Sequence, residues 1–187
     1  DSDVVNLTQW VYPHVQLVVV ANPSFAEGDE LPSSLTQVGV DQTFYVEVWL
    51  QERGRFPAGL SGGFVDLAYD NGVLQAEQVL NADFSLLADG RIAPDAGLID
   101  DLGGVRFGEG HGTTPAWTRL ALVELTAQTP GTTNLSLSPG KFPFAQFGRG
   151  NIPWTNVTFG GAVVQVAGQD TCLVTTTADS GPGSLRR

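Results

Sequence analysis

The residues best suited to acid–base chemistry are Glu109 and His111, which share one glycine-rich stretch, and Asp100 and Asp101 shortly before them. A carboxylate beside a histidine can act as an acid–base pair or contribute to a metal site. On glycine-rich loops, such residues are more often simply solvated. The chain also has no Gly-x-Ser-x-Gly elbow, no His-Glu-x-x-His helix and no phosphate-binding glycine loop. The sequence therefore predicts a protein that is not an enzyme.

Oxygen ligands suitable for calcium are more plentiful than catalytic pairs. Asp66, Asp70, Asn71, Asp100 and Asp101 offer the hard oxygen atoms that calcium prefers. The Asp-x-Asp-x-Asp-Gly loop of an EF-hand is missing. We therefore expect no required cofactor, and the sequence leaves a structural calcium ion open without assigning its ligands.

Two aromatic side chains, Tyr45 and Trp49, are four residues apart in an alternating segment, which places them on one strand face about 13 Å apart. If exposed, they could stack on sugar rings or form a protein-binding patch. We favour the alternative that a loop, or the N-terminal stretch containing Trp10, covers them. The aromatics Phe142, Phe144 and Phe147 are expected to close one end of the domain.

These side chains must be positioned by strands, because nearly every periodic segment has a two-residue period and is bounded by Gly, Pro, Asn or Asp. A short helical turn is expected at most, near residues 81–87 or 94–102. The pattern predicts an all-β sandwich or barrel. The expected strands are residues 15–21, 42–51, 63–69, 74–79, 104–107, 119–127, 132–137 and 157–166.

Composition narrows the class of protein further. The chain has 187 residues and a formal net charge of −11, which disfavours nucleic acid as a partner. Its longest apolar run, residues 17–21, is far shorter than the roughly 20 residues of a membrane-spanning helix. The single cysteine, Cys172, excludes an internal disulfide and is expected to be a small buried side chain. The acidic balance and the absence of methionine suggest a secreted or cell-surface segment of a longer precursor.

Three regions are expected along the chain. Residues 1–14 form a flank or an extra edge strand, residues 15–168 form the sandwich, and residues 169–187 form a tail. The tail is threonine-rich and ends in Gly-Pro-Gly-Ser-Leu-Arg-Arg. It resembles the opening of the right-handed parallel β-helix modules of large bacterial surface proteins. A single solenoid repeat cannot bury its own face, so the tail is expected to be a truncated module or a linker.

The order of several segments resembles the cohesin family. The chain carries Val38-Gly39-Val40-Asp41 before a strand, then an alternating strand ending in Tyr69-Asp70-Asn71-Gly72, and later a closing segment with the pair Gly160-Gly161. The resemblance implies a nine-stranded, jelly-roll-like antiparallel β-sandwich that binds a protein partner through one sheet face. Within that family, the chain is similar to the cohesin-like domains of large bacterial surface proteins.

One departure from the family concerns the strand before Tyr69-Asp70. Cohesins that bind dockerins commonly carry an Asn-x-Asp pair there, and this chain has Gly62 and Phe64 at the matching positions. We expect partner contacts on the face bearing Phe64, Asp66 and Ala68, together with Glu77. The predicted function is protein–protein interaction, with a dockerin-type module as one candidate partner. The alternatives are polysaccharide binding through Tyr45 and Trp49, and a purely structural spacer.

Overall fold

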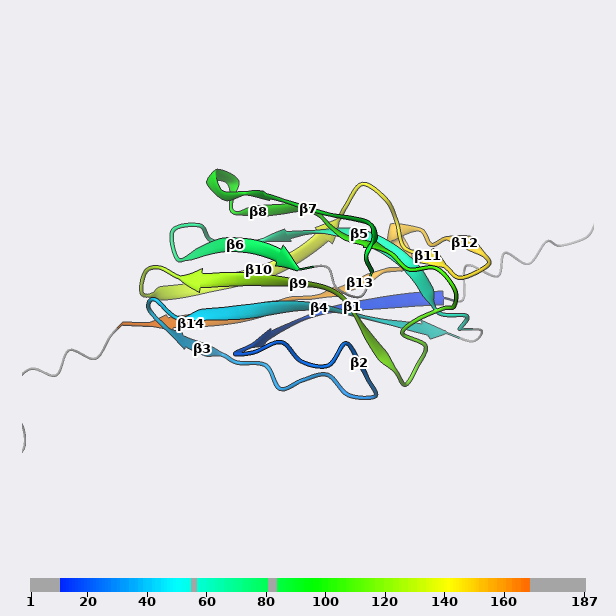
Figure 1. Ribbon diagram of the computed structural model, residues 1–187, viewed down its shortest axis with the longest axis horizontal. Coiled ribbons are helices and arrows are strands. Elements are labelled where there is room, and N and C mark those ends of the chain that lie inside the picture. Colours follow the sequence, from blue (N-terminus) through cyan, green and yellow to red (C-terminus); the bar gives the residue numbers. More distant parts are fainter. Residues whose placement is uncertain (1–10, 55–56, 81–83, 169–187) are drawn as a thin grey trace, which may run out of the picture.

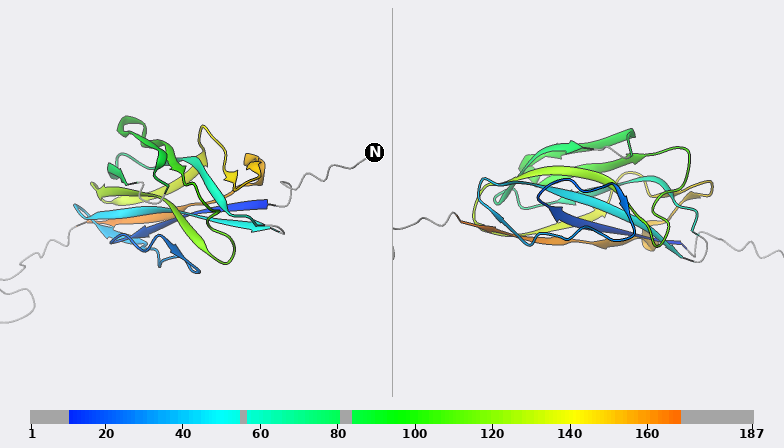
Figure 2. Two further views of the ribbon diagram at one scale, coloured as in Figure 1. Left: turned by 45° about the vertical axis from the view of Figure 1, so that its right-hand side comes forward. Right: turned by 60° about the horizontal axis from the view of Figure 1, so that its bottom comes forward.

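The chain folds into two β-sheets that pack face to face (Figures 1 and 2). The computed structural model describes residues 11–54, 57–80 and 84–168. The first sheet has the order β13-β1-β4-β9-β2, and β6 also pairs with β9. Its strands are β1 (Val11–Val20), β2 (Glu27–Gly28), β4 (Thr43–Gly54), β6 (Leu74–Leu80), β9 (Trp117–Ala127) and β13 (Thr158–Gly160).

The second sheet is built around β5 (Leu60–Ala68) and has the order β12-β11-β5-β10-β14-β3. On its other side, β5 pairs with β8, and β8 pairs with β7. The remaining strands are β3 (Gln37–Gly39), β7 (Leu86–Ala93), β8 (Leu98–Val105), β10 (Gly131–Pro139), β11 (Ala145–Gln146), β12 (Gly150–Asn151) and β14 (Ala162–Ala167). The predicted all-β sandwich is confirmed. Several strands contain only two or three residues, and the expected number of nine is not confirmed.

The closing segment crosses from one sheet to the other. β13 runs parallel to β1 in the first sheet, whereas β14 runs antiparallel to β10 in the second. A side chain at Gly161 would bring its Cβ to 2.6 Å from the carbonyl oxygen of Leu135, so the crossing needs a glycine there. The segment predicted as one strand over residues 157–166 is therefore two strands with the glycine pair at their junction.

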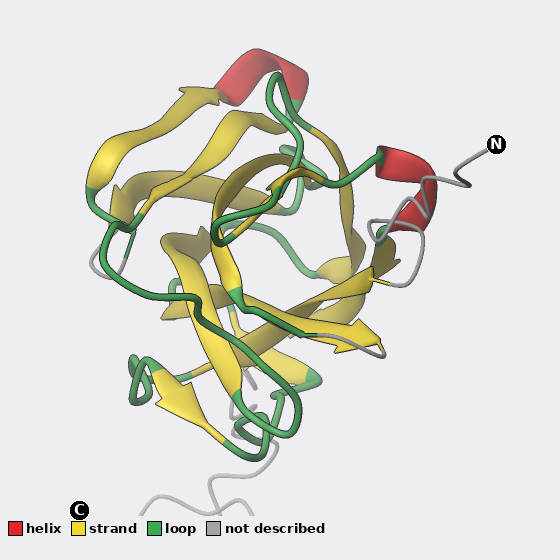
Figure 3. Ribbon diagram, turned by 90° about the vertical axis from the view of Figure 1, so that its right-hand side faces the viewer, coloured by secondary structure: helices red, strands yellow, loops and turns green. Residues whose placement is uncertain are grey.

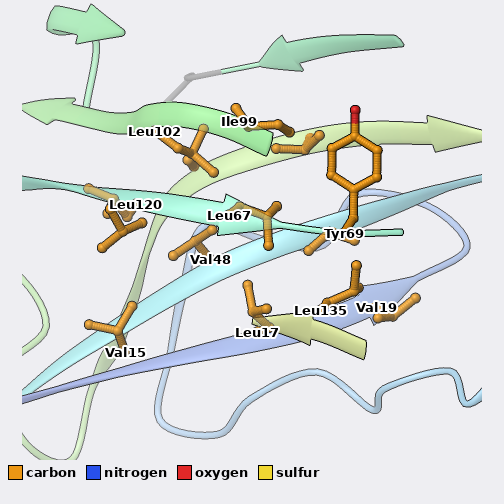
Figure 4. Close-up of a cluster of buried hydrophobic side chains, with 14 of the residues drawn as sticks. Val15, Leu17, Val19, Val48, Leu67, Tyr69, Ile99, Leu102, Leu120 and Leu135 are labelled. Carbon is orange, nitrogen blue, oxygen red and sulfur yellow. The ribbon is translucent and has the colours of Figure 1, made fainter. Parts of the chain in front are cut away.

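The main core lies between the sheets because each strand turns alternate side chains inward. In β4 the inward residues Phe44, Val46, Val48 and Leu50 are completely buried. Figure 4 shows Val48 of the first sheet beside Leu67 and Leu102 of the second, and all three belong to one continuous apolar cluster.

A second, smaller core lies on the outer side of the first sheet. Val18, Val20, Trp49 and Trp117 are buried together there, and Leu31 and Tyr45 pack against them. Leu31 belongs to the segment of residues 21–36, which runs along the outside of this sheet (Figure 1, below β4). The loop that was predicted to cover the β4 aromatics is therefore present. The alternative cover, Trp10, lies outside the described residues.

Helical structure among the described residues is limited to two 3-10 turns, η2 (Pro94–Ala96) and η3 (Trp154–Asn156), drawn in red in Figure 3. The η2 turn lies in one of the two places expected. Neither turn is long enough to cross a membrane, and no helix of the described residues is apolar and long enough to do so.

Residues 11–14, which were expected to belong to a flank or an extra edge strand, form the first part of β1 and pair with β4. The structure adds β7, residues 98–103 of β8 and the short strands β2, β3, β11 and β12, which the sequence pattern did not indicate. Residues 1–10 and the tail of residues 169–187, including Cys172, lie outside the described residues.

Candidate partner-binding face

The outer face of the second sheet carries three of the four residues predicted to bind a partner. Val65 and Leu67 of β5 point into the core, so Phe64, Asp66 and Ala68 point away from it. The fourth predicted residue, Glu77, is exposed but belongs to β6, which pairs with β9 in the other sheet. Including Glu77 on this face was therefore wrong.

Neighbouring strands extend this face with polar side chains. Ser138 of β10 is paired with Asp66, and Ser136 is paired with Ala68. Both serines are exposed. On the other side of β5, the pairing with β8 is irregular opposite Asp66, where Asp100 and Asp101 lie. The irregularity brings carboxylates from two strands together on one face.

Asp66, Asp100 and Asp101 form a cluster in which one oxygen from each lies within 4.8 Å of the others. Asp66 Oδ1 accepts a hydrogen bond of 3.0 Å from the backbone N–H of Asp101. Asp101 has a φ of 57°, a conformation that Asp tolerates better than most residues. The other two residues noted for their oxygen atoms, Asp70 and Asn71, form hydrogen bonds elsewhere: Asp70 Oδ1 accepts from the N–H of Gly72, and the Asn71 amide donates to backbone carbonyls.

Two cations neutralise part of this acidic cluster. Arg91 of β7 forms an ion pair of 3.0 Å with Asp100. Lys141 Nζ lies 2.5 Å from Asp89 Oδ2 and 3.3 Å from Asp101 Oδ2. The hydrogen bond from Lys141 lowers the pKa of Asp89, and the same bond raises the pKa of Lys141. The carboxylates therefore already have cationic and amide partners. We call Asp66, Asp89, Asp100 and Asp101, with Arg91 and Lys141, the charged strip.

An apolar hollow of about 290 Å³ adjoins the charged strip. Phe64 forms one wall and is only 4% exposed, whereas Phe142 and Leu87 are 57% and 77% exposed. The lining includes Gly62, Phe64, Leu87, Val105, Phe142 and Ala145.

Lys141 connects the hollow to the charged strip. Its Nζ lies 5.4 Å from the centroid of the Phe64 ring and 5.9 Å from that of Phe142. The two rings meet edge to face at 5.8 Å. The backbone of residues 140–142 follows β5, because Phe64 N–H donates to the Phe142 carbonyl and Gly140 N–H donates to the Phe64 carbonyl. The aromatic wall is therefore held in place by backbone hydrogen bonds as well as by ring contacts.

Gly62 explains in physical terms why the polar pair of dockerin-binding cohesins is missing. A Cβ at this position would lie 2.3 Å from the carbonyl oxygen of Gly104, and the φ of Gly62 is 154°. No side chain therefore fits at Gly62 with this packing of β5 against β8. An apolar hollow occupies the place where the resemblance would put an Asn side chain.

The predicted sugar-binding pair is not available on the surface. Trp49 is 1% exposed, and its Nε1 donates a hydrogen bond of 2.9 Å to Glu47 Oε2. Tyr45 is half-buried and packs on the same cluster. Trp49 is therefore covered, as favoured from the sequence, by residues 21–36 and Trp117, and the alternative of an exposed Tyr45–Trp49 pair does not hold for Trp49.

The possible acid–base pair of Glu109 and His111 is also not formed. His111 is 5% exposed and its Nδ1 lies 3.5 Å from Glu27 Oε1, whereas Glu109 is exposed. Burial lowers the pKa of His111. Its ring packs edge to face against Phe84 at 5.7 Å, and its backbone pairs with Leu60. These contacts give His111 a structural role.

Sequence reasoning missed Lys141, Leu87 and Asp89 as members of this face. It placed Phe142 in a plug at the end of the sandwich, together with Phe144 and Phe147. Phe144 does fill the core and is fully buried, whereas Phe142 and Phe147 are 57% and 40% exposed. The alternation of aromatic and small residues in this stretch was the only signal in the sequence that could have separated inward from outward rings.

The chain resembles known proteins in its fold but has no match among family models or curated proteins by sequence. No protein-family model matches the sequence. No curated protein matches it either.

Solved structures do match. A type I cohesin of Pseudobacteroides cellulosolvens has a TM-score of 0.58 and 13% identity, covering 86% of this chain and 95% of its own. A cohesin module from a Clostridium perfringens family 33 glycoside hydrolase has a TM-score of 0.55 and 13% identity, covering 85% and 99%. A chain of a type I cohesin–dockerin complex from Clostridium thermocellum has a TM-score of 0.55 and 11% identity, covering 82% and 99%. The described residues of this chain therefore adopt the cohesin-like β-sandwich fold.

Proposed function

We propose that this chain is a non-enzymatic protein–protein interaction module of a secreted or cell-surface protein. The partner is a protein, and a dockerin-type module is the first candidate. The binding surface is the outer face of the second sheet, formed by β5, β7, β8 and β10. The polysaccharide alternative is not carried forward, because its main aromatic, Trp49, is buried.

The observation that supports this proposal most is the apolar hollow beside the charged strip, on a sheet face where Asp66 and Ala68 are half-buried and Ser136 and Ser138 are exposed. Protein interfaces combine an apolar centre with a polar rim, and this face offers both within one sheet. The outer face of the first sheet has no comparable surface near β4, since residues 21–36 cover it. Two of the structural neighbours were solved as complexes with dockerins, which makes a dockerin-type partner the natural first candidate.

The experiment is an affinity capture with the full chain as bait. The prey is the secreted and surface protein fraction of the source organism, with and without calcium. Captured proteins are identified by mass spectrometry, purified and titrated back calorimetrically. The face variant is Ala68→Arg, which places a large charged side chain at the C-terminal end of β5, between its partners in β10 and β8. The control is Phe25→Arg, because Phe25 is 92% exposed and lies in the segment outside the first sheet.

We expect a partner whose affinity falls by at least about tenfold in Ala68→Arg and changes by less than about twofold in Phe25→Arg. A dockerin-type partner will additionally require calcium for its own folding. A folded bait that captures no protein, or one whose partner is indifferent to Ala68→Arg, would contradict the proposal. In that case the remaining function is a structural spacer.

A further inference from the structure

The apolar hollow is a built feature of the backbone. Its open floor depends on Gly62, where a side chain would collide with the Gly104 carbonyl. Its wall depends on the hydrogen bond from Phe64 N–H to the Phe142 carbonyl, 3.3 Å long. Because these two features belong to the backbone, the floor of the hollow and the position of its aromatic wall are set before any partner arrives. Preorganisation of this kind reduces the entropic cost of binding.

The rim of the hollow exposes apolar side chains to water, which is unfavourable for the free protein. Leu87 is 77% exposed and has a φ of 52°, a region that a leucine rarely occupies. Strained backbone conformations of this type concentrate at binding sites. Phe142 on the opposite side is 57% exposed. Covering both side chains removes apolar surface from water, so an apolar group on the partner would bind favourably here.

The size of the hollow limits what can fill it. At about 290 Å³ it lies at the lower end of the range for small-molecule pockets, roughly 300–1,000 Å³. It is also open on the side of Leu87 and Phe142. One large aliphatic or aromatic side chain fits this space better than a cofactor would, and anchoring side chains of that kind dominate protein interfaces.

The charged strip determines which charge is favourable on the partner's residues beside its apolar side chain. Four carboxylates face two cations there, Arg91 and Lys141, and the whole chain has a formal net charge of −11. The strip therefore carries a net negative charge immediately beside the hollow. A partner that presents lysine or arginine next to its apolar anchor is electrostatically complementary, whereas an acidic partner is repelled.

We infer that the protein partner inserts one large apolar side chain into the hollow between Phe64, Leu87 and Phe142 and places basic residues against the charged strip. This rests on the proposed function and specifies the chemistry of the partner at that same face. An apolar anchor with basic flanks takes the position that a polar Asn-x-Asp contact would otherwise occupy. Such a partner differs from one that binds a polar strand face through hydrogen bonds.

The test uses a displayed library as the probe. The dockerin module of the Clostridium thermocellum complex is displayed on yeast as a library of randomly substituted variants, and it is selected against the full 187-residue chain. Enriched clones are sequenced and titrated against Leu87→Asp, Phe142→Asp and Ala68→Arg. Phe25→Asp is the matched control, since it also replaces an exposed apolar side chain by Asp, in the segment outside the other sheet. Thermal melting of each variant shows that it is folded.

We expect enriched clones to share one Leu, Ile, Phe or Trp flanked by Lys or Arg. Their affinity should fall by at least about tenfold in Leu87→Asp and in Phe142→Asp and by less than about twofold in Phe25→Asp. Raising the salt concentration should weaken binding, because the flanking contacts are between charges.

Two outcomes would overturn the inference in different ways. Clones with polar contacts that are blocked by Ala68→Arg but tolerate Leu87→Asp and Phe142→Asp would refute the apolar anchor and leave the proposed function intact. Clones that are indifferent to all three face variants, or no enriched clones at all, would count against both.

Discussion

The buried ion pair that fastens residues 21–36 over the first sheet gives a prediction whose size can be worked out. Glu47 is fully buried, and its Oε1 lies 2.8 Å from Arg119 NH1, which is 7% exposed. Glu47 also accepts hydrogen bonds from Trp49 Nε1 and from the N–H and hydroxyl of Ser24. Arg119 donates in addition to the Ser24 carbonyl, and its backbone N–H donates to Ala26. These contacts join β4, β9 and the covering segment.

Glu47→Gln keeps the shape of this side chain and removes its charge, which deletes the buried ion pair with Arg119. Removing one partner of a buried pair costs about 3–5 kcal/mol of unfolding free energy. At roughly 2–4 °C per kcal/mol for a domain of this size, the melting temperature should fall by roughly 6–20 °C. Adding Arg119→Met also removes the buried cation that Glu47 neutralises in the wild type, so the double variant should be more stable than Glu47→Gln alone.

The assay is a double-mutant cycle measured by urea unfolding and calorimetry. The four proteins are the wild type, Glu47→Gln, Arg119→Met and the double variant. A strong favourable coupling energy between the two positions supports the reasoning. If Glu47→Gln costs less than about 1 kcal/mol of unfolding free energy, or if the two effects are additive, the ion pair does not hold residues 21–36 against the first sheet.

Three further predictions concern the core and the turns. Burial raises the pKa of the Glu52 carboxyl above its usual value, so its contribution to stability is present at low pH and lost as the pH rises through the raised pKa. The stability of the wild type relative to Glu52→Gln, measured by urea unfolding from about pH 4 to about pH 8, should therefore fall with rising pH; a flat difference would contradict this. Gly97 has a φ of 59°, and a Cβ there would lie 2.2 Å from the Tyr69 carbonyl oxygen. Gly97→Ala should therefore lower the melting temperature clearly. The control Gly108→Ala should lower it less, because no atom lies within 4 Å of a Cβ at that position. Phe144 is fully buried, so Phe144→Ala should cost about 3–5 kcal/mol in urea unfolding, and a loss below about 1 kcal/mol would show that its contacts are weaker than the structure implies.

The inner half of the sandwich could be predicted from the sequence because alternation is a local property. The alternation in β4 and β5 separated Phe44, Val46, Val65 and Leu67 from their outward neighbours, and the structure confirms this separation. What lies over the outward side chains depends on distant segments. Trp49 was correctly assigned to the outer face of β4, but a local pattern could not show that residues 21–36 bury it.

The strand β7 was missed because its local pattern is irregular. Its pairing with β8 shifts register twice, Leu87 has a positive φ, and Gly90 interrupts the alternation. Most of its residues are exposed or half-buried, so no apolar face marked it as a strand. Two of the six residues of the charged strip, Asp89 and Arg91, and Leu87 of the hollow lie on this strand and were missed with it.

The site itself was predicted only where one strand supplied it. Asp66 and Ala68 were identified from the β5 alternation, and Asp100 and Asp101 were noted as oxygen ligands. The hydrogen bond of 2.7 Å between Lys141 N–H and Asp101 Oδ1 joins residues forty positions apart in the sequence. Contacts of this kind arise from the sheet topology, and neither composition nor spacing reveals them.

The most direct test of the central claim is a hydrogen-exchange map of the chain with its captured and purified partner. The account predicts new protection of backbone amides in β5, in β8 and in residues 140–143, with residues 21–36 unchanged. Such a pattern would place the partner on the outer face of the second sheet. Protection confined to residues 21–36, or to β1 and β4, would show that the partner binds the opposite side and would contradict the account.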